Sequence, residues 1–281
     1  MDLKNRIVIV TGATSGVGYA LTESLLRKGA YVVMFNRDET KSKNVIEKLK
    51  NETGSTSIDF IKVDFSSMES VKEAANEFTK NYKRLDVLIN NAALSNKDKE
   101  FSRDGIEKTF AVNHLGYFLL TNLLLDTLKN SAPAKIINIA SKAHTKIDFD
   151  NLNGEKFFNP FTAYQYSKMG NIYFTYELAE RLKDSEITVN CTHPGVVRTL
   201  IYRETYGIIK LMIKLMWPFF KTPQKSASII MPLIESKEFE KTTGKFFIDT
   251  KISEPKKGTY DIESQKRLWE LSEKLTGVKY N

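Results

Sequence analysis

The sequence predicts an α/β fold in which one parallel, doubly wound sheet carries helices on both faces. Short β-branched runs alternate with longer segments of helical period along almost the whole chain. The first run ends in a glycine-rich turn that leads into a helical pattern, which is the context of a phosphate-binding turn. The chain has 281 residues, 41% of them hydrophobic, and no linker, repeat or low-complexity tract divides it. We therefore expect a single domain over residues 1–281.

The expected elements follow from the alternation. Seven strands are predicted: Arg6–Val10, Tyr31–Phe35, Ile58–Val63, Leu85–Ile89, Lys135–Ala140, Ile187–Cys191 and Gly244–Ile248. Helices are predicted through Leu21, Leu25 and Leu26, over Lys41–Lys50, Met68–Tyr82, Ile106–Leu128, Gln224–Ile234 and Ile262–Leu275, and from about Ala163 to Leu182. Right-handed crossovers place the carboxyl ends of the strands at one edge of the sheet, where open α/β sheets bind ligands.

The chain is basic, with a formal net charge of +8. Its lysines and arginines are spread through the helical segments without an aromatic-interleaved stripe, and no nucleic-acid-binding motif appears. A solvated surface is therefore expected rather than a nucleic-acid groove. Contact with a phosphorylated molecule or an anionic membrane stays open.

The cysteine and histidine content indicates a reducing compartment and no metal site. Cys191 is the only cysteine, so no internal disulfide can form. The three histidines are scattered, and no CxxC or HExxH motif occurs. The apolar run near the N-terminus is too short for a signal peptide or an anchor. These features favour a cytoplasmic protein, with peripheral contact to an intracellular membrane as an additional option.

The turn TGATSGVG, Thr11 to Gly18, is the first candidate site. Gly12, Gly16 and Gly18 would permit a tight turn and the close approach of a pyrophosphate to backbone N–H groups. The helix dipole would also favour an anion there. The next strand ends in Asn36 and Arg37. A neutral residue followed by arginine suits the 2′-phosphate of NADP, so we expect NADP(H) to be preferred over NAD(H).

Further polar residues follow the later strands. Asp64 and the turn Asn90-Asn91-Ala92-Ala93 come at strand ends, and Ser141 follows Lys135–Ala140, where its hydroxyl could bind a substrate. Asn113 lies in a strongly apolar helix, so it either ties that helix to a neighbouring backbone or holds a water molecule.

Tyr164 and Lys168 are four residues apart in a predicted helix and so project from one face. An ammonium about 4 Å from a phenolate stabilises it by up to ~4 kcal/mol at an effective dielectric of roughly 20. Such a pair can exchange protons near neutral pH. Ordinary surface residues of an amphipathic helix are the alternative.

Residues 206–221 form the most apolar segment, within an insertion at about 196–225. The segment is too short to span a bilayer. Its pattern is compatible with two roles: an amphipathic helix in a membrane interface, or a lid over an apolar substrate pocket.

Taken together, these motifs resemble the short-chain dehydrogenase/reductases over essentially the whole chain. They appear in the family's order: TGATSGVG, Asp64, NNAA, Asn113, Ser141, the Tyr164/Lys168 pair and HPGVVRT. Several stretches resemble the retinol dehydrogenase branch: VNHLGYFLLT, IASKAH, LMWPFFKTPQKSA, GKFFID and LWELSEKL. One departure is Ala93, where the family turn has glycine. A second concerns the N-terminal apolar anchor often found in membrane-bound retinol dehydrogenases, which we do not expect here because the first apolar run is short.

The resemblance implies a Rossmann-like fold and an NADP-dependent oxidoreductase. It implies that Tyr164 is the acid/base, that Lys168 binds the nicotinamide ribose, that Ser141 holds the substrate carbonyl or hydroxyl, and that Asn113 supports a proton-relay water. The implied cofactor-binding residues are Thr11, Gly12, Gly16, Val17, Gly18, Arg37, Asp64, Asn90, Ala92, Tyr164, Lys168, Pro194, Gly195 and Thr199. The implied substrate is a small hydrophobic alcohol or carbonyl compound, retinoid-, steroid- or lipid-like, and the family favours a homodimer.

Two other functions are considered. One is an NADP(H)-sensing interaction protein without turnover, and the other is a peripheral membrane protein that docks through residues 206–221. The sensing role is disfavoured because Asn113, Ser141, Tyr164 and Lys168 are all present.

Overall fold

A single eight-stranded sheet organises the computed structural model, which describes residues 1–197 and 220–280. Its order is β3-β2-β1-β4-β5-β6-β7-β8. The strands are β1 (Ile7–Thr11), β2 (Tyr31–Asn36), β3 (Ile58–Lys62), β4 (Val87–Asn90), β5 (Ala134–Ile139), β6 (Ile187–His193), β7 (Lys245–Ile248) and β8 (Lys251–Ser253). The first seven pair in parallel, which confirms the predicted doubly wound sheet.

The eighth strand corrects the predicted count of seven. β8 pairs antiparallel with β7 at the edge of the sheet. Two residues separate the strands, and Asp249 in that turn has a φ of 56°. This edge strand has only three residues, of which Lys251 and Ile252 are exposed. It has no buried apolar run to mark it, so periodicity did not reveal it.

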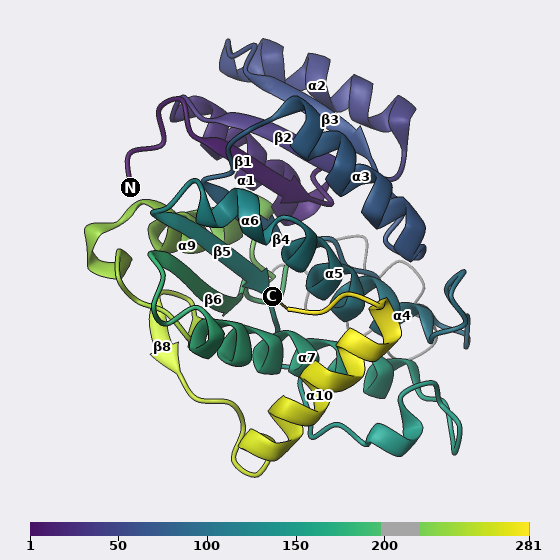
Figure 1. Ribbon diagram of the computed structural model, residues 1–281. Helices are drawn as coiled ribbons and strands as arrows, with labels where there is room; N and C mark the ends of the chain where they lie inside the picture. The colour runs from purple at the N-terminus through teal and green to yellow at the C-terminus, as the bar shows by residue number, and fades with distance from the viewer. Residues whose placement is uncertain (198–219, 281) are drawn as a thin grey trace.

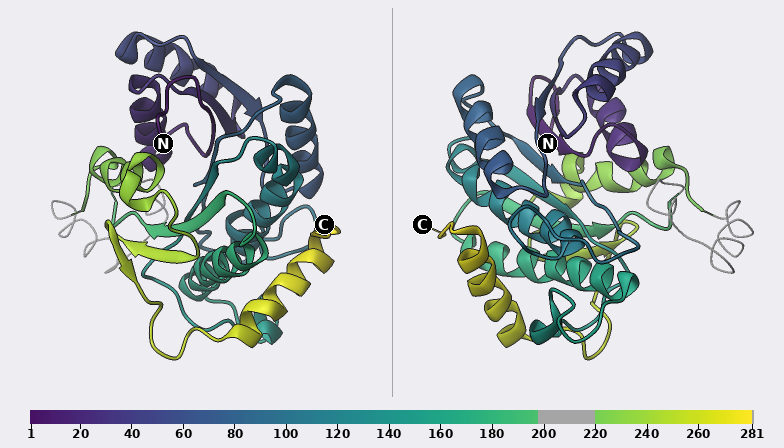
Figure 2. Two further views of the ribbon diagram at one scale, coloured as in Figure 1. Left: turned by 60° about the vertical axis from the view of Figure 1, so that its left-hand side comes forward. Right: turned by 90° about the vertical axis from the view of Figure 1, so that its right-hand side faces the viewer.

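Two helical layers cover the sheet (Figures 1 and 2). On one face α1 (Gly16–Arg27), α2 (Glu39–Thr53) and α9 (Pro223–Glu235) bury their apolar sides against the strands. On the other face lie α3 (Met68–Asn81), α5 (Gly116–Leu123) and α7 (Pro160–Arg181). The last helix, α10 (Ile262–Thr276), packs on the outside of α7. The side chains of the inner strands are consequently buried on both faces, as is typical of a parallel sheet.

The predicted helix Ile106–Leu128 is not one regular helix. It divides into α4 (Lys108–Phe110), a π-helical turn η1 (Ala111–Leu115), α5, and α6 (Leu125–Lys129). Leu124 has φ −99° and ψ 2°, which separates α5 from α6. Asn113 lies in the π-helical turn, and such turns are frequent at functional sites. Two short 3₁₀ turns, η2 (Phe149–Asn151) and η5 (Lys237–Phe239), lie in connections.

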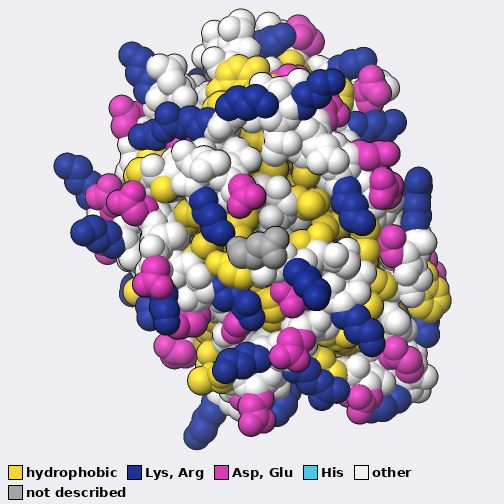
Figure 3. Space-filling model, in the orientation of Figure 1, with side chains coloured by type: hydrophobic (Ala, Val, Ile, Leu, Met, Phe, Trp, Pro, Cys, Tyr) yellow, Lys and Arg dark blue, Asp and Glu magenta, His cyan; other side chains and the backbone are white. Residues whose placement is uncertain are grey.

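The surface carries both signs of charge. On the face shown in Figure 3, Lys and Arg side chains are interspersed with Asp and Glu. In the described part of the chain, no helix is long and apolar enough to cross a membrane. Residues 206–219 of the apolar segment lie outside the described residues. Val197 and Lys221, which lie on either side of residues 198–219, pair in an isolated parallel bridge.

Candidate active site

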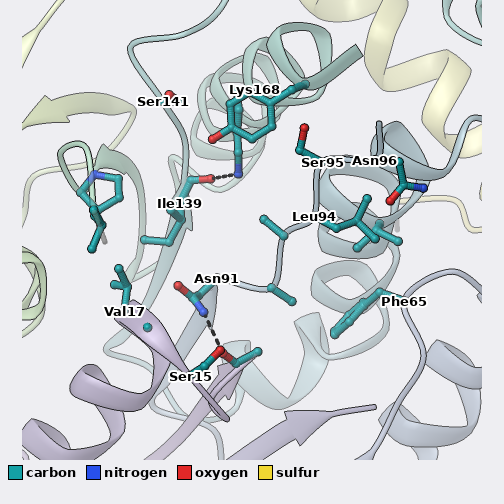
Figure 4. Close-up of a pocket in the computed structure, with 18 of the residues that line it drawn as sticks. Ser15, Val17, Phe65, Asn91, Leu94, Ser95, Asn96, Ile139, Ser141 and Lys168 are labelled. Carbon is teal, nitrogen blue, oxygen red and sulfur yellow. Dashed lines mark hydrogen bonds between the residues drawn. The ribbon is translucent and has the colours of Figure 1, made fainter. Parts of the chain in front are cut away.

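A cavity of about 1080 Å³ opens at the carboxyl ends of the strands. Residues at or just after the ends of β1, β2, β3, β4, β5 and β6 line it. Most of the predicted site residues meet there: Gly12, Gly16, Val17, Arg37, Asp64, Ala92, Ser141, Tyr164, Lys168, Pro194 and Gly195. In Figure 4, Ser15, Val17 and Asn91 lie across the cavity from Ser141 and Lys168.

The glycine-rich turn is held close to the turn after β4. Gly12 has a φ of 66°, and a Cβ there would lie 2.8 Å from the Cα of Ala92. Gly18 does not line the cavity; a Cβ on it would lie 2.3 Å from the Gly12 carbonyl oxygen. Both positions therefore require glycine. Ser15 is the N-cap residue of α1 and makes no side-chain capping bond, so its first turn offers backbone N–H groups to an anion.

Hydrogen bonds of Thr11 and Asn91 join the glycine-rich turn to the turn after β4. The Thr11 hydroxyl accepts hydrogen bonds from the backbone N–H groups of Asn91 and Ala92, each at 2.8 Å. The Asn91 amide donates to the carbonyl oxygens of Thr11, at 2.8 Å, and Gly12, at 3.2 Å. Thr11 is fully buried and does not line the cavity, so its role is to join two turns.

The end of β2 and the start of α2 present cations to the cavity. Arg37 and Lys41 both line it, and Arg37 is exposed. Asn36 points back into the protein, where its side-chain oxygen accepts from Ala13 N–H at 2.8 Å. Asp38 also lines the cavity, but its carboxylate caps α2 by accepting from Lys41 N–H at 2.9 Å. The acidic group nearest to Arg37 in sequence is therefore already bonded to the protein.

Asp64 remains ionised at the end of β3. Burial would raise the pKa of its carboxyl group, but two hydrogen bonds from Ser66 and the charges of Arg37 and Arg103 outweigh burial and lower it. One carboxylate oxygen accepts from Ser66 N–H at 3.0 Å and from the Ser66 hydroxyl at 2.7 Å. A carboxylate held in this way is a rigid acceptor at the wall of the cavity.

Like Thr11 and Gly18, the predicted residues Asn90 and Asn113 do not line the cavity. Asn90 is fully buried and donates to Thr121 at 3.0 Å and to Asn138 at 2.9 Å. Asn113 accepts from Leu94 N–H at 2.8 Å and donates to the Leu94 carbonyl at 2.9 Å. Of the two roles open to Asn113 from sequence, these bonds correspond to tying the helix to a neighbouring backbone.

The segment after β5 and the start of α7 bring three polar groups together. Ser141 is buried at the end of β5, and its hydroxyl oxygen accepts from Ala143 N–H at 3.0 Å, which leaves its proton to donate. Asn159 caps α7 by accepting from Phe161 and Thr162 N–H groups, each at 3.0 Å. This cap places Tyr164 in the first turns of α7, and Lys168 follows one turn later.

Lys168 is almost fully buried behind Tyr164. Its Nζ donates to the Ile139 carbonyl at 3.0 Å (Figure 4). The same Nζ lies 5.6 Å from the centroid of the Tyr164 ring. Burial lowers the pKa of the Lys168 ammonium to about 7. When charged, Lys168 would favour a phenolate centred on that ring by about 3 kcal/mol at an effective dielectric of ~20. The pair therefore has the geometry of an acid/base unit.

The end of β6 and the turn that follows it form another part of the cavity wall. His193 lines the cavity, and burial, with smaller contributions from Lys142 and Lys221, lowers the pKa of its imidazole to about 4. Pro194 and Gly195 follow it at the cavity wall. Thr199, the last predicted cofactor-binding residue, lies outside the described residues.

Several lining residues were not identified from the sequence. Asn91 could have been, because it directly follows the last residue of β4, where the chain leaves the sheet at its ligand-binding edge. Lys41, Lys142 and Phe161 had no signal beyond their position near a strand end or helix start. Ala93 has no positive φ, so the glycine of the family turn is not needed there. Within residues 1–197 and 220–280, no group of three His, Cys, Asp or Glu side chains could hold a metal ion.

Comparison with known proteins identifies the family. A family model described as short chain dehydrogenase matches residues 6–206. Human retinol dehydrogenase 14 is 38% identical, over 98% of this chain and 88% of that protein. Human polyprenol dehydrogenase is 35% identical, over 98% of this chain and 86% of that protein. A Pseudomonas aeruginosa structure, the RhlG/NADP active-site complex, has a TM-score of 0.71 at 25% identity, covering 88% of this chain and 95% of that chain.

The family model spans most of the chain, and both human relatives exceed 30% identity over nearly all of it. The chain therefore belongs to the short-chain dehydrogenase/reductase family of oxidoreductases, within its retinol dehydrogenase branch.

Proposed function

We propose that this protein is an NADP(H)-dependent oxidoreductase that interconverts a hydrophobic alcohol and its aldehyde or ketone, with Tyr164 as acid/base. One observation carries the proposal. Ser141, Tyr164 and Lys168 line the same cavity as the glycine-rich turn at the N-terminus of α1. No observation favours the NADP(H)-sensing alternative, because the polar groups needed for turnover meet in one place.

The cavity fits a dinucleotide. Close packing of Gly12 on Ala92 and of Gly18 on the Gly12 carbonyl keeps the turn tight. The N-terminus of α1 has no side-chain cap, so a pyrophosphate would find free N–H groups there. Arg37 and Lys41 would hold a 2′-phosphate, while the Asp38 carboxylate is engaged at the N-terminus of α2. The structural likeness to a protein solved with NADP supports the preference for NADP(H).

The chain's own groups would handle the proton. In the direction of reduction, Tyr164 would donate its phenolic proton to the substrate oxygen, and Ser141 would donate a hydrogen bond to the same oxygen. Lys168 would stabilise the resulting phenolate. A bound NADPH would supply the hydride. In the direction of oxidation, Tyr164 would accept the alcohol proton instead.

The substrate class follows from the apolar residues of the cavity lining. Leu94, Pro160, Phe161 and Val196 line the cavity, and Phe161 and Val196 are exposed there. An apolar wall around a few polar groups suits a hydrophobic carbonyl compound. Two relatives are named for a retinol and a polyprenol activity, which agrees with a retinoid- or lipid-like substrate. A homodimer, membrane contact through residues 206–221 and a cytoplasmic location stay predictions.

The test is oxidation of NADPH and NADH by the purified protein with retinal, medium-chain aldehydes, an aromatic ketone and a ketosteroid. We expect turnover of at least one hydrophobic carbonyl, with NADPH favoured at least ~10-fold, since charge-assisted bonds to a phosphate contribute about 1.5 to 3 kcal/mol. Tight NADPH binding without turnover of any of these substrates would contradict the proposed activity. Preference for NADH would contradict the assigned role of Arg37.

A further inference from the structure

Lys168 is a buried cation without a carboxylate partner. Only 1% of the residue is exposed. Its ammonium donates to the Ile139 carbonyl at 3.0 Å, and that carbonyl also accepts from the Asn171 amide at 3.2 Å. In the described part of the chain no Asp or Glu forms an ion pair with it. A buried charge in this position needs compensation from its surroundings.

Two aromatic rings flank the ammonium. The Tyr164 ring centroid lies 5.6 Å from Lys168 Nζ, and the Tyr117 ring centroid lies 6.0 Å from it. Tyr117 projects from α5, on the neighbouring helix, and is fully buried. The face of an aromatic ring attracts a cation, and the attraction is strongest where water is excluded. Lys168 is thus bounded by one tyrosine that lines the cavity and one that does not.

The Tyr117 hydroxyl does not explain why a tyrosine stands there. It is buried and has no hydrogen-bond partner. Burial, together with the nearby Tyr164, raises the pKa of the Tyr117 phenol well above its ordinary value, so it stays neutral and can carry no compensating charge. The ring is the part of Tyr117 that faces the ammonium.

We propose that Tyr117 is a positioning residue of the site, whose ring face holds the Lys168 ammonium charged and beside Tyr164. This rests on the proposed function, in which Lys168 acts through Tyr164. Among the described residues, the titratable groups that interact with Lys168 include His193 from β6 as well as the two tyrosines. Burial lowers the pKa of the His193 imidazole to about 4, so it is neutral at pH 7. Burial opposes the charge on Lys168. The Ile139 carbonyl and the two rings favour it.

The test measures the titration of Lys168 directly, in the protein without cofactor. The Cε signal of Lys168 in ¹³C-lysine-labelled protein is assigned by its absence in Lys168→Met and followed by NMR from pH 5 to 10. In Tyr117→Leu the midpoint should fall by about one pH unit, because a desolvated cation–π contact is lost. In Tyr117→Phe the ring remains, so the midpoint should equal that of the unmodified protein.

Phe118→Leu is the matched control. Phe118 is the next residue of α5, is 1% exposed, and packs against Phe174 and Trp269. It should lose comparable packing without moving the Lys168 midpoint. An unchanged midpoint in Tyr117→Leu would overturn the proposal, and so would an equal shift in Tyr117→Phe, which would assign the effect to the hydroxyl. If Tyr117→Leu does not fold, Tyr117→Met makes the same comparison.

Turnover separates this inference from the proposed function. If the enzyme reduces a carbonyl compound, Tyr117→Leu should move the alkaline limb of its kcat profile down by about the same one pH unit. Absence of turnover in every protein would reject the proposed function, while the NMR midpoints would still decide the role of Tyr117.

Discussion

The burial of Lys168 predicts an unusual dependence of stability on pH. The ammonium of an exposed lysine has a pKa of 10.5, and burial lowers that of Lys168 to about 7. At about 1.4 kcal/mol per pH unit, this difference corresponds to about 5 kcal/mol. Below pH 7 the folded protein carries the buried charge, and its free energy of unfolding is lower by that full amount. Between pH 7 and 10.5 the unfolded chain holds a proton that the folded chain lacks, so the free energy of unfolding rises with pH.

Substitution of Lys168 by methionine tests this reasoning. The methionine keeps the apolar stem and removes the charge, and the Ile139 carbonyl keeps its bond from Asn171. We expect Lys168→Met to be more stable than the unmodified protein at pH 7. We also expect it to lose a rise of about 2 kcal/mol in the free energy of unfolding between pH 7 and 9. The range stops at pH 9 because burial raises the pKa of Cys191 to about 12, which reduces stability above that point.

Denaturant unfolding followed by far-UV circular dichroism, at intervals from pH 6.5 to 9, gives the free energies. Lys80→Met is the control, because Lys80 is exposed on α3 and should leave the slope unchanged. Burial also lowers the pKa of Lys135, so a smaller slope of the same sign should remain in Lys168→Met. If Lys168→Met were less stable than the unmodified protein and kept its full slope, the assigned burial cost would be refuted.

Three further predictions concern the cofactor end and the core. Arg37→Gln should weaken NADPH binding roughly 10- to 100-fold and leave NADH binding unchanged. The control, Lys43→Gln on the exposed side of α2, should change the affinity for neither cofactor. Both affinities are measured by fluorescence titration. Gly18→Ala should destabilise the protein by about 1 to 3 kcal/mol and weaken binding of both cofactors, because its Cβ would meet the Gly12 carbonyl. Equal melting temperatures for Gly18→Ala and the unmodified protein would contradict that contact. Burial lowers the pKa of His114 to about 3, so stability present above pH 6.5 should be lost as the pH falls, and His114→Gln should unfold less steeply in acid titration than the unmodified protein.

Much of the fold could be predicted because parallel strands are buried on both faces. Their apolar runs stand out, and seven of the eight strands were found within a few residues of their true ends. β8 was missed because an edge strand of three residues buries too little to be patterned. The break of Ile106–Leu128 into several helical pieces was missed because a π-helical turn keeps the same apolar composition.

The site was partly predictable for a related reason. Residues after parallel strands must meet at one edge, so Arg37, Asp64 and Ser141 could be placed at the cavity from their positions alone. The direction in which each side chain points could not be predicted from position alone. Asn90 turns into the core and Asn91 takes the place next to the glycine turn. Tyr117 was hidden in an apolar run, where only the packing of α5 against α7 reveals its contact with Lys168.

The central claim is that Tyr164 moves the proton in this cavity. The most direct measurement compares Tyr164→Phe with Tyr166→Phe, both in α7, by recording NADPH affinity and the rate of carbonyl reduction for each. The Tyr166 side chain is buried in a core cluster and does not line the cavity. We expect Tyr164→Phe to reduce kcat by at least ~100-fold with NADPH affinity unchanged, and Tyr166→Phe to stay near the unmodified rate. Turnover by Tyr164→Phe within a few-fold of the unmodified protein would contradict the account.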